Sequence, residues 1–365
     1  MKFVPQLFLF LFLAALTAGC GGNRPSSKTG EPAGAGAKKE FTMAWSIYAG
    51  WQPWDYADRS GILKKWADKY GLHIKLVKMD YVPSIEAYVS GQADACVMTN
   101  IEALDMPAAA GVASTAVVLG DFSNGNDALL VRDNLSLADL AGKQVSLVQY
   151  SVSHYLLSRA LEKSGLKESD VTILNTSDSD IAPAFMANND QKAVVTWNPM
   201  VLDIKRQPGI KSLFSSASIP GEVLDLLVVN SKVLQANTAF AKALTGAWYE
   251  VMAVMKKEDA AADKALTVMA ESAGCPLEVY KEQLKTTALF YTPNSALNYV
   301  KSKEIMKSMD YVRKFCFNHG LLGEKATSYD ELGIAYPGGQ VQGDAQNVQL
   351  TFDPTYMEMA AKTAL

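Results

Sequence analysis

The stretch Ala44–Tyr56, AWSIYAGWQPWDY, decides how the chain is organised, because it joins a predicted strand to an aromatic turn. Before the turn, apolar residues recur at every second position, the period of a strand: Phe41, Met43, Trp45 and Ile47. The turn around Ala49-Gly50 is rich in aromatic residues. Either the rings cap one end of a core, or they wall a ligand pocket where a first strand stops. The rest of the chain decides between these interpretations.

The N-terminus has the pattern of an export signal over residues 1–19. Phe3–Leu16 is an apolar run too short and too close to the start for a membrane span. It ends in LTAGC, which resembles a lipoprotein box, although Thr17 stands where an aliphatic residue is usual. We therefore predict that Cys20 carries a diacyl anchor rather than being a chance cysteine behind an ordinary signal. Residues 20–39, rich in Gly, Ser, Pro and Lys, are predicted to form a flexible tether.

Charge and cysteine usage exclude several classes of protein. The 365 residues carry a net charge of −4 with no basic stripe, so a nucleic-acid partner is not expected. Three cysteines remain after Cys20, without a CxxC spacing, and three histidines are scattered along the chain, so we predict no metal site and no cofactor. A bridge between Cys275 and Cys316 and buried free thiols both stay open as alternatives.

Two similar runs of alternating strands and helices follow, and helices dominate after them. The runs predict an α/β fold with two open, mostly parallel sheets. Two extended connections, near residues 128–132 and 228–230, predict a two-strand hinge with a cleft between the lobes. The expected organisation is then lobe 1 from residues 40–130 and 230–335, lobe 2 from residues 131–229, and a C-terminal arm at 336–365 that is either poorly ordered or a wrap.

Ligands of such open sheets lie beyond the carboxyl ends of the strands, so we take the candidate site from those ends. The candidates are aromatic, acidic or small and polar: Tyr48, Trp51, Trp54, Thr99, Asn100, Asp121, Ser151, Ser153, Trp197, Glu222 and Asp225. The same ends carry Asp80, Glu102, His154 and Asn198.

No lysine or arginine is among these candidates, and this decides the expected charge of the ligand. Anions are usually bound by Arg, by Lys or by helix N-termini, and only two N-termini are expected here, at Asn100 and Ser153. Ring faces attract cations by about 0.5 to 2 kcal/mol. Carboxylates accept paired hydrogen bonds from a planar guanidinium. The candidates therefore favour a cationic ligand.

Structural alternatives exist for most candidates. Asp121 could accept bonds from the amides of the turn that follows it. Thr99 and Asn100 could serve only as helix caps, Trp197 could plug the second lobe, and Glu222 and Asp225 could be solvated. Ser151, Ser153 and His154 lack the GxSxG elbow and the separation of a catalytic triad, so no catalytic residue is predicted.

Several motifs resemble a known family over essentially all of the chain after the leader. CVMTNIEAL, GDFSNGNDALLV and TWNPMV are similar to substrate-binding lipoproteins of ABC importers in the nitrate/taurine family. More narrowly, IYAGWQPWDYADRSGILKKWADKYG and MTNIEALDMPAAAGVASTAVVLGDFSNGND look like the branch associated with urea carboxylase operons, whose carboxylases act largely on guanidine. The resemblance implies a two-lobed, class II periplasmic-binding-protein fold.

Together, residues and resemblance predict a non-enzymatic solute-binding lipoprotein of an ABC importer. The expected solute is guanidinium first and urea second, walled by Trp51 and Trp197 and bound by Asp121 with Glu222 or Asp225. Expected partners are a permease and ATPase complex, with the protein monomeric and lipid-anchored in the periplasm or at the outer face of the cytoplasmic membrane.

Two alternatives remain: a nitrate, taurine or sulfonate binder, and an enzyme resembling thiamine-pyrimidine synthases. The enzyme would use pyridoxal phosphate and would need a Lys and a His at the pocket.

Overall fold

A computed structural model describes residues 38–323 and 325–365 of the chain. These residues belong to one compact unit, Ala37–Leu365. The expected leader, the predicted lipidation residue Cys20 and residues 20–37 of the expected tether lie outside the described residues. Among the residues that are described, no helix is both long enough and apolar enough to cross a bilayer.

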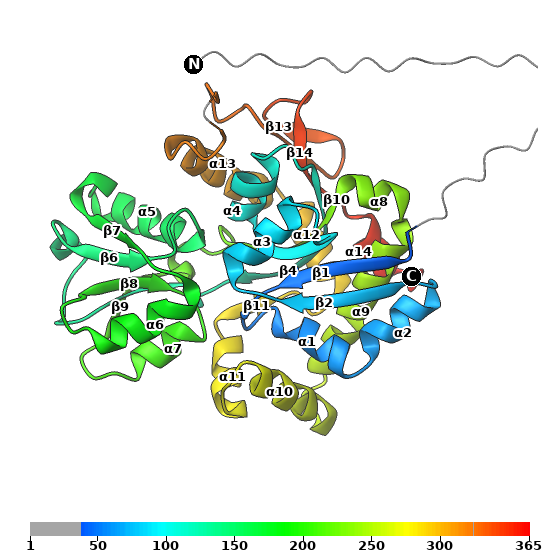
Figure 1. Cartoon of the computed structure of the whole chain (residues 1–365), viewed down its shortest axis with the longest axis horizontal. Helices are drawn as coiled ribbons and strands as arrows, with labels where there is room; N and C mark the ends of the chain where they lie inside the picture. Colours follow the sequence, from blue (N-terminus) through cyan, green and yellow to red (C-terminus); the bar gives the residue numbers. More distant parts are fainter. Residues whose placement is uncertain (1–37, 324) are drawn as a thin grey trace, which may run out of the picture. The chain divides into compact units, whose positions relative to one another are not determined.

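The larger of the two sheets has the strand order β13-β12-β14-β4-β10-β3-β1-β2, and β11 pairs with β4 (Figure 1). Its central strands are buried along nearly their whole length, which explains their continuous apolar sequences, such as LDLLVVN in β10. The strands are β1 (Glu40–Trp45), β2 (His73–Lys78), β3 (Ala95–Thr99), β4 (Ser114–Ser123), β10 (Leu224–Asn230), β11 (Thr287–Leu289), β12 (Gly333–Tyr336), β13 (Gln340–Gln342) and β14 (Val348–Phe352).

The smaller sheet has the order β7-β6-β8-β5-β9. Its strands are β5 (Ala128–Val131), β6 (Gln144–Leu147), β7 (Thr172–Asn175), β8 (Ala193–Thr196) and β9 (Lys211–Ser215). Both sheets are mixed rather than mostly parallel. In the large sheet β10 is antiparallel to β3 and β4, and in the small sheet β5 is antiparallel to β8 and β9. Each of these two strands adjoins a connection between the sheets.

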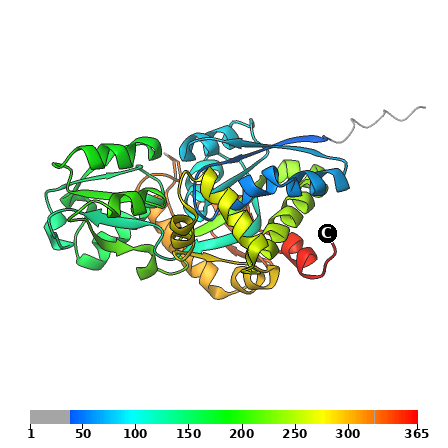
Figure 2. The same cartoon turned by 90° about the horizontal axis from the view of Figure 1, so that it is seen from below.

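Helices cover both faces of each sheet. Figure 1 shows α3 and α4 above the large sheet and α1, α2 and α9 below it, with α5 above and α6 and α7 below the small one. Figure 2, seen from below, shows the blue helices of residues 52–69 beside the yellow-green helices of residues 238–272, and these pairs are in contact. The α-helices are α1 (Gln52–Arg59), α2 (Ile62–Lys69), α3 (Tyr81–Val89), α4 (Asn100–Ala103), α5 (Val152–Ser164), α6 (Asp178–Ala187), α7 (Met200–Lys205), α8 (Ser231–Ala236), α9 (Thr238–Met255), α10 (Ala260–Ser272), α11 (Leu277–Leu284), α12 (Pro293–Val300), α13 (Lys303–Asn318) and α14 (Thr355–Ala361).

The chain crosses between the sheets twice, at residues 124–127 between β4 and β5 and at residues 216–223 between β9 and β10. The two expected crossings are therefore present, but the lobe boundaries differ from those predicted. Strand β5 belongs to the small sheet although residues 128–130 were expected in lobe 1, and β10 is a central strand of the large sheet although most of it was expected in lobe 2.

The C-terminal segment is part of the large sheet. The predicted arm at 336–365 contains β13, β14 and α14, and β14 runs parallel to β4 with Leu350 opposite Ser114. Of the two alternatives, the poorly ordered arm was wrong and the wrap agrees with this packing. Pro, Gly and Gln dominate the turns of the segment, while apolar residues of β14, such as Leu350 and Phe352, reach the core.

Candidate functional site

A small cavity lies where the two lobes meet, at the ends of strands from both sheets. The centre of a water-sized sphere can occupy about 20 Å³ of the cavity. One water molecule needs about 10 to 15 Å³ on the same measure. Five predicted candidates line it: Tyr48, Trp51, Thr99, Trp197 and Asp225. The other lining residues are Tyr81, Asn126, Asp127 and Val152.

Four aromatic rings form one continuous wall of the cavity. The ring centroids of Tyr48 and Trp51 are 5.0 Å apart, those of Trp51 and Tyr81 5.5 Å, and those of Tyr81 and Trp197 5.7 Å. Trp197 comes from the small lobe, directly after β8, and its indole N–H points to the carbonyl oxygen of Ile47 at 3.4 Å. The wall therefore spans both lobes, and every ring is buried.

Two buried aspartates lie side by side at one end of the large sheet. Asp225 of β10 is the register partner of Asp121 of β4. The Tyr48 hydroxyl donates to Asp121 Oδ1 at 2.7 Å. Asp121 Oδ2 finds no donor among the described residues unless Asp225 carries a proton. The turn at Gly50 closes against this pair, since a Cβ there would lie 2.4 Å from Asp121 Oδ2.

Burial dominates the electrostatics of these carboxyl groups. It raises the pKa of Asp121 to about 7, and the hydrogen bonds from Tyr48 and Asp225 only partly offset that rise. Burial and the repulsion of Asp121 together hold the pKa of Asp225 well above its ordinary value. Burial also raises the pKa of Asp127 to about 6. A cation in the cavity would stabilise the ionised forms of all three.

The crossover at residues 124–127 supplies two residues that line the cavity, Asn126 and Asp127. The Ser123 hydroxyl donates to Asp127, and Ser216 from the second crossover bonds to the Ser123 hydroxyl and to the Gly125 N–H. Asn126 is fully buried, and neither its amide nitrogen nor its amide oxygen has a partner among the described side chains and backbone. The Asn126 side chain is nevertheless close enough to Asp127 to lower the pKa of that carboxyl group, so its amide oxygen is the group left unused beside the cavity.

Several predicted candidates lie elsewhere. Trp54 packs against Trp248 behind the cavity, with ring centroids 5.1 Å apart. Asn100 bonds to the backbone of Glu222 and Leu224. Ser151 caps α5 by accepting a bond from the Ser153 N–H, and the Ser153 hydroxyl is buried without a partner among the described residues.

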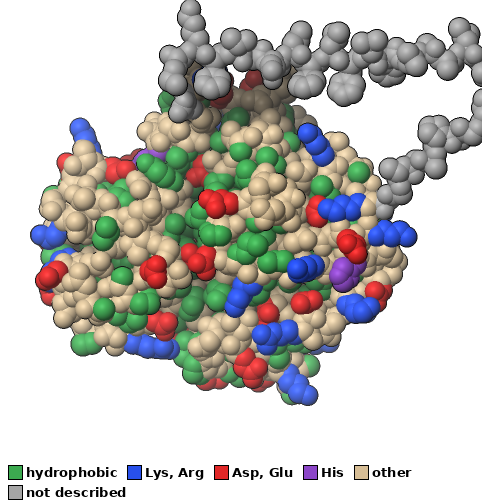
Figure 3. Space-filling view, viewed as in Figure 1, with side chains coloured by type: hydrophobic (Ala, Val, Ile, Leu, Met, Phe, Trp, Pro, Cys, Tyr) green, Lys and Arg blue, Asp and Glu red, His purple; other side chains and the backbone are tan. Residues whose placement is uncertain are grey.

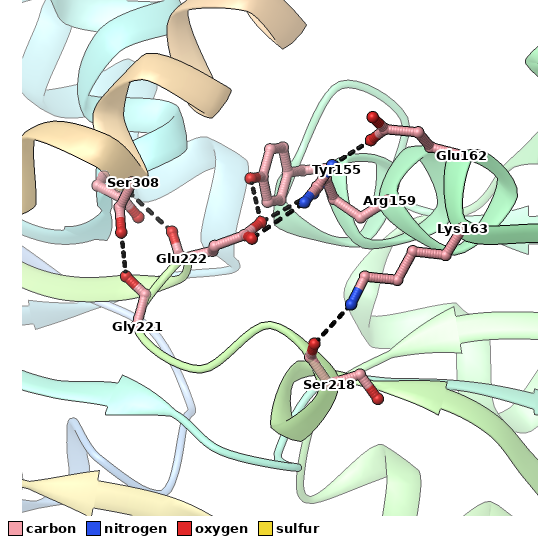
Figure 4. Close-up of polar contacts among 9 residues, drawn as sticks. Tyr155, Arg159, Glu162, Lys163, Ser218, Gly221, Glu222 and Ser308 are labelled. Atoms are coloured by element: carbon pink, nitrogen blue, oxygen red, sulfur yellow. Dashed lines mark hydrogen bonds and ion pairs between the residues drawn. The ribbon is translucent and has the colours of Figure 1, made fainter. Parts of the chain in front are cut away.

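Glu222 lies on the second crossover and pairs with the small lobe instead of facing the cavity (Figure 4). Its carboxylate accepts from the Tyr155 hydroxyl at 2.6 Å and from Arg159 Nε at 2.9 Å and Nη2 at 3.1 Å. Each side chain of the ion pair is 12% exposed. The predicted ligand contact of Glu222 is thus replaced by an ion pair, and Asp225 is the acidic candidate that lines the cavity.

Tyr81, Asn126, Asp127 and Val152 were missed, although a signal for some of them was present. Tyr81 lies three residues after the end of β2, at the first position of α3. Asp127 belongs to the turn NGND. Its place beside the cavity follows from the position of the lobe boundary, which the sequence alone did not locate.

One group of side chains has the spacing of a metal site among the described residues. Possible ligand atoms of His154, Glu168 and His319 lie within 4.8 Å of one another, so the structure brings together two histidines that the sequence analysis called scattered. His154 Nδ1 accepts the Tyr150 N–H at 3.1 Å, which leaves the proton of a neutral ring on Nε2, facing Glu168 at 3.0 Å. His319 bonds to Phe315 O and to Glu168, whose hydrogen bonds from the histidines lower its pKa to about 2 against the effect of burial. Within the group, His319 is hydrogen-bonded to Glu168, while His154 Nε2 lies near Glu168 without a hydrogen bond of normal geometry.

The described cysteines Cys96, Cys275 and Cys316 are free thiols. Of the residues that line the cavity, none is Lys, Arg or His. On the face that Figure 3 presents, acidic and basic side chains are interspersed over the surface. The concentration of acidic groups without basic ones is therefore a property of the buried cavity rather than of the surface seen in that view.

Comparisons with known proteins agree with this architecture. Residues 127–262 match a family model described as NMT1/THI5 like. The chain is 25% identical over 161 residues to the putative aliphatic sulfonates-binding protein of Escherichia coli (strain K12), a match that covers 43% of this chain and 49% of that protein. It thus spans about half the length of this curated relative.

Two solved structures show how widely the fold is used. The alkanesulfonate-binding protein SsuA from Xanthomonas axonopodis pv. citri, bound to MOPS, has a TM-score of 0.66 at 19% identity, covering 79% of this chain and 96% of that one. The desulfurization enzyme DSZB has a TM-score of 0.54 at 14% identity, covering 80% and 95%. The chain therefore has the two-lobed periplasmic-binding-protein fold, and its residues 127–262 are similar to the NMT1/THI5-like family.

Proposed function

We propose that this protein is the solute-binding component of an ABC importer and that its solute is a small, planar, nitrogen-rich compound, with the guanidinium cation preferred and neutral urea second. The observation that carries the proposal is the lining of the cavity, which offers four aromatic rings and two aspartates and contains no Lys, Arg or His. The fold, and a curated relative named for binding aliphatic sulfonates, support the importer role. The protein binds its solute without making or breaking a bond.

The cavity has room for one or two water molecules, so a planar solute of four heavy atoms would have to move the lining side chains slightly apart. A planar ligand would lie against the rings of Trp51, Tyr81 and Trp197, and its N–H groups would point to Asp225 and Asp127. Asp121 would act through its contact with Asp225, as an additional negative charge one step behind the lining. The amide oxygen of Asn126 offers one further acceptor.

The runner-up solute is a sulfonate, taurine or nitrate, and the names of the relatives favour it. An anion in this cavity would face Asp127 and Asp225 without a basic side chain to offset them. The enzyme alternative resembling thiamine-pyrimidine synthases needs a Lys and a His at the pocket, and the lining residues include neither.

Attachment to the membrane is a separate part of the proposal. The LTAGC motif supports export and lipidation at Cys20, and residues 20–39 are long enough to act as a tether. A monomer anchored in this way would deliver its solute to a permease and ATPase complex.

Thermal unfolding with a panel of solutes tests the proposal. A ligand that binds only the folded state stabilises it by RT ln(1 + [L]/Kd), about 2.7 kcal/mol at a hundredfold excess over Kd. Micromolar to millimolar guanidinium should raise the melting temperature saturably, urea should raise it less, and nitrate, taurine and methanesulfonate should have no effect at matched ionic strength. Asp225→Asn should remove the guanidinium response, and the exposed Asp190→Asn should keep it. Tight binding of an anion without guanidinium binding would reject the cationic solute and leave the importer role standing.

A further inference from the structure

Glu102 is a buried carboxylate that connects the two lobes directly behind the cavity wall. It lies on α4 in the large lobe, and the residue is 1% exposed. It accepts hydrogen bonds from the Tyr81 hydroxyl at 2.6 Å and from the Thr99 hydroxyl. It also accepts the backbone N–H of Val152, in the small lobe, at 2.7 Å. All three donors belong to residues that line the cavity.

The Val152 N–H is the first of helix α5, which has 13 residues. The N–H groups of a first helical turn have no partner within the helix, and together they carry a partial positive charge. Such a position attracts anions. In this protein the Ser153 N–H is bound by the Ser151 hydroxyl and the Val152 N–H by Glu102. The position in the cleft that best suits an anion is therefore filled by a carboxylate of the protein itself.

Burial raises the pKa of Glu102, and the hydrogen bonds from Thr99, Tyr81 and Val152 oppose that rise by favouring the ionised carboxylate. Asp105, one turn further along, has its pKa raised by burial and by the charge of Glu102. The charge of Glu102 also reaches across the cavity, where it adds to the rise in the pKa of Asp127. An anion that entered the cavity would meet this field and would have to displace Glu102 from the helix terminus.

We propose that Glu102 is a specificity-determining residue, a built-in anion that occupies the N-terminus of α5 in the closed protein and so excludes anionic solutes. This inference rests on the proposed function, because it explains how the cavity selects for a cation. Glu102 need not touch the solute; it acts through the Val152 N–H, the Tyr81 hydroxyl and the field in the cavity.

Isosteric replacement separates the charge of Glu102 from its size. In Glu102→Gln the amide oxygen can still accept the Val152 N–H, while the charge is removed. The matched control is Glu86→Gln, which removes one charge from an exposed position on α3 of the same lobe. Calorimetry with guanidinium chloride and sodium methanesulfonate should show guanidinium binding weakened at least tenfold and methanesulfonate binding gained in Glu102→Gln. Glu86→Gln should behave as the wild type.

A second substitution tests whether the gained anion lies at the helix. Proline suits the first position of a helix and has no N–H, and Ser151 already has the extended backbone, with ψ −177°, that a residue before proline adopts. Adding Val152→Pro to Glu102→Gln should therefore abolish the gained methanesulfonate binding. Persistent binding would place the anion elsewhere and overturn the assignment.

Glu102→Ala repeats the test with the side chain removed, and cooperative thermal unfolding identifies the variants that fold. If every folded Glu102 variant keeps the wild-type preference between guanidinium and methanesulfonate, the role of Glu102 is refuted while the proposed function stands. If the wild type itself binds methanesulfonate and not guanidinium, the proposed function fails first, whatever the variants do.

Discussion

Asp121→Asn should make the ligand-free protein more stable at pH 8 while weakening its binding of guanidinium. The asparagine keeps the shape of the side chain and an oxygen that can accept the Tyr48 hydroxyl, which lies 2.7 Å from Asp121 Oδ1. Its amide nitrogen can donate to Asp225, the neighbouring carboxyl group. The substitution therefore removes a buried charge, keeps the hydrogen bond from Tyr48 and reverses the direction of the hydrogen bond shared with Asp225.

The magnitude follows from the pKa of Asp121. Burial raises that pKa from 3.8 to about 7, and each unit corresponds to about 1.4 kcal/mol. A carboxyl group whose pKa is higher in the folded state gives its full stability below pH 3.8, and that stability is lost as the pH rises through 7. Ionised Asp121 thus lowers the free energy of unfolding by up to roughly 4 kcal/mol at pH 8 and by much less at pH 5. The gain from Asp121→Asn should grow over the same range.

Scanning calorimetry between pH 5 and 8.5 measures this gain, with Asp190→Asn as the exposed control of equal charge change. Chemical denaturation is unsuitable, because urea and guanidinium are the proposed solutes. Guanidinium binding by Asp121→Asn should weaken at least tenfold, since truncating a desolvated charge pair costs about 2 to 5 kcal/mol. A variant that is less stable than the wild type at pH 8, or whose gain does not change with pH, would refute the reasoning.

Four further predictions address the rings, the turn, the pH dependence and the anchor. Trp51→Ala and Trp197→Ala should each weaken guanidinium binding by at least about 1.4 kcal/mol, or tenfold, with a cooperative unfolding transition retained; wild-type titrations by both would show that the cleft is misplaced. Gly50→Ala should weaken binding in the same calorimetric assay, because its Cβ would lie 2.4 Å from a carboxylate oxygen of the site. Guanidinium affinity should rise between pH 5 and 8, because burial raises the pKa of Asp127 to about 6 and the cation needs the ionised form; a flat profile from titrations across this range would contradict it. Cys20→Ser should abolish metabolic labelling by a fatty acid, and equal label on both proteins would reject the lipoprotein box.

The fold was predictable because its periodic signals are local. Strand β3 and the aromatic turn after β1 are read directly from their residues, and the rule that ligands lie at strand ends brought Tyr48, Trp51 and Thr99 to one cavity. The rule also placed Trp197 there from the other lobe. Predicting these residues did not require knowing which strands are neighbours, because the strand ends that carry them, in both sheets, face the same cleft.

The remaining parts depend on distant contacts that no local pattern contains. Glu222 was expected to face the ligand, but its carboxylate forms an ion pair with Arg159, 63 positions away in the sequence. Glu102 was noted at a strand end, but its bond to Val152 links residues 50 positions apart in different lobes. Each of these outcomes depends on how the two lobes meet, which is a tertiary property.

The arrangement of the carboxyl groups also explains how a cation would favour closure of the lobes. In this structure Asp121, Asp127 and Asp225 are all buried, and near neutral pH burial disfavours their ionised forms. Without a cation, closing the lobes over ionised carboxylates therefore requires proton uptake or a desolvation cost. A bound guanidinium would remove that cost by pairing with the carboxylates, so binding of the cation would favour closure of the lobes. A neutral solute such as urea would leave the charges uncompensated, which is the physical reason to expect the order guanidinium before urea.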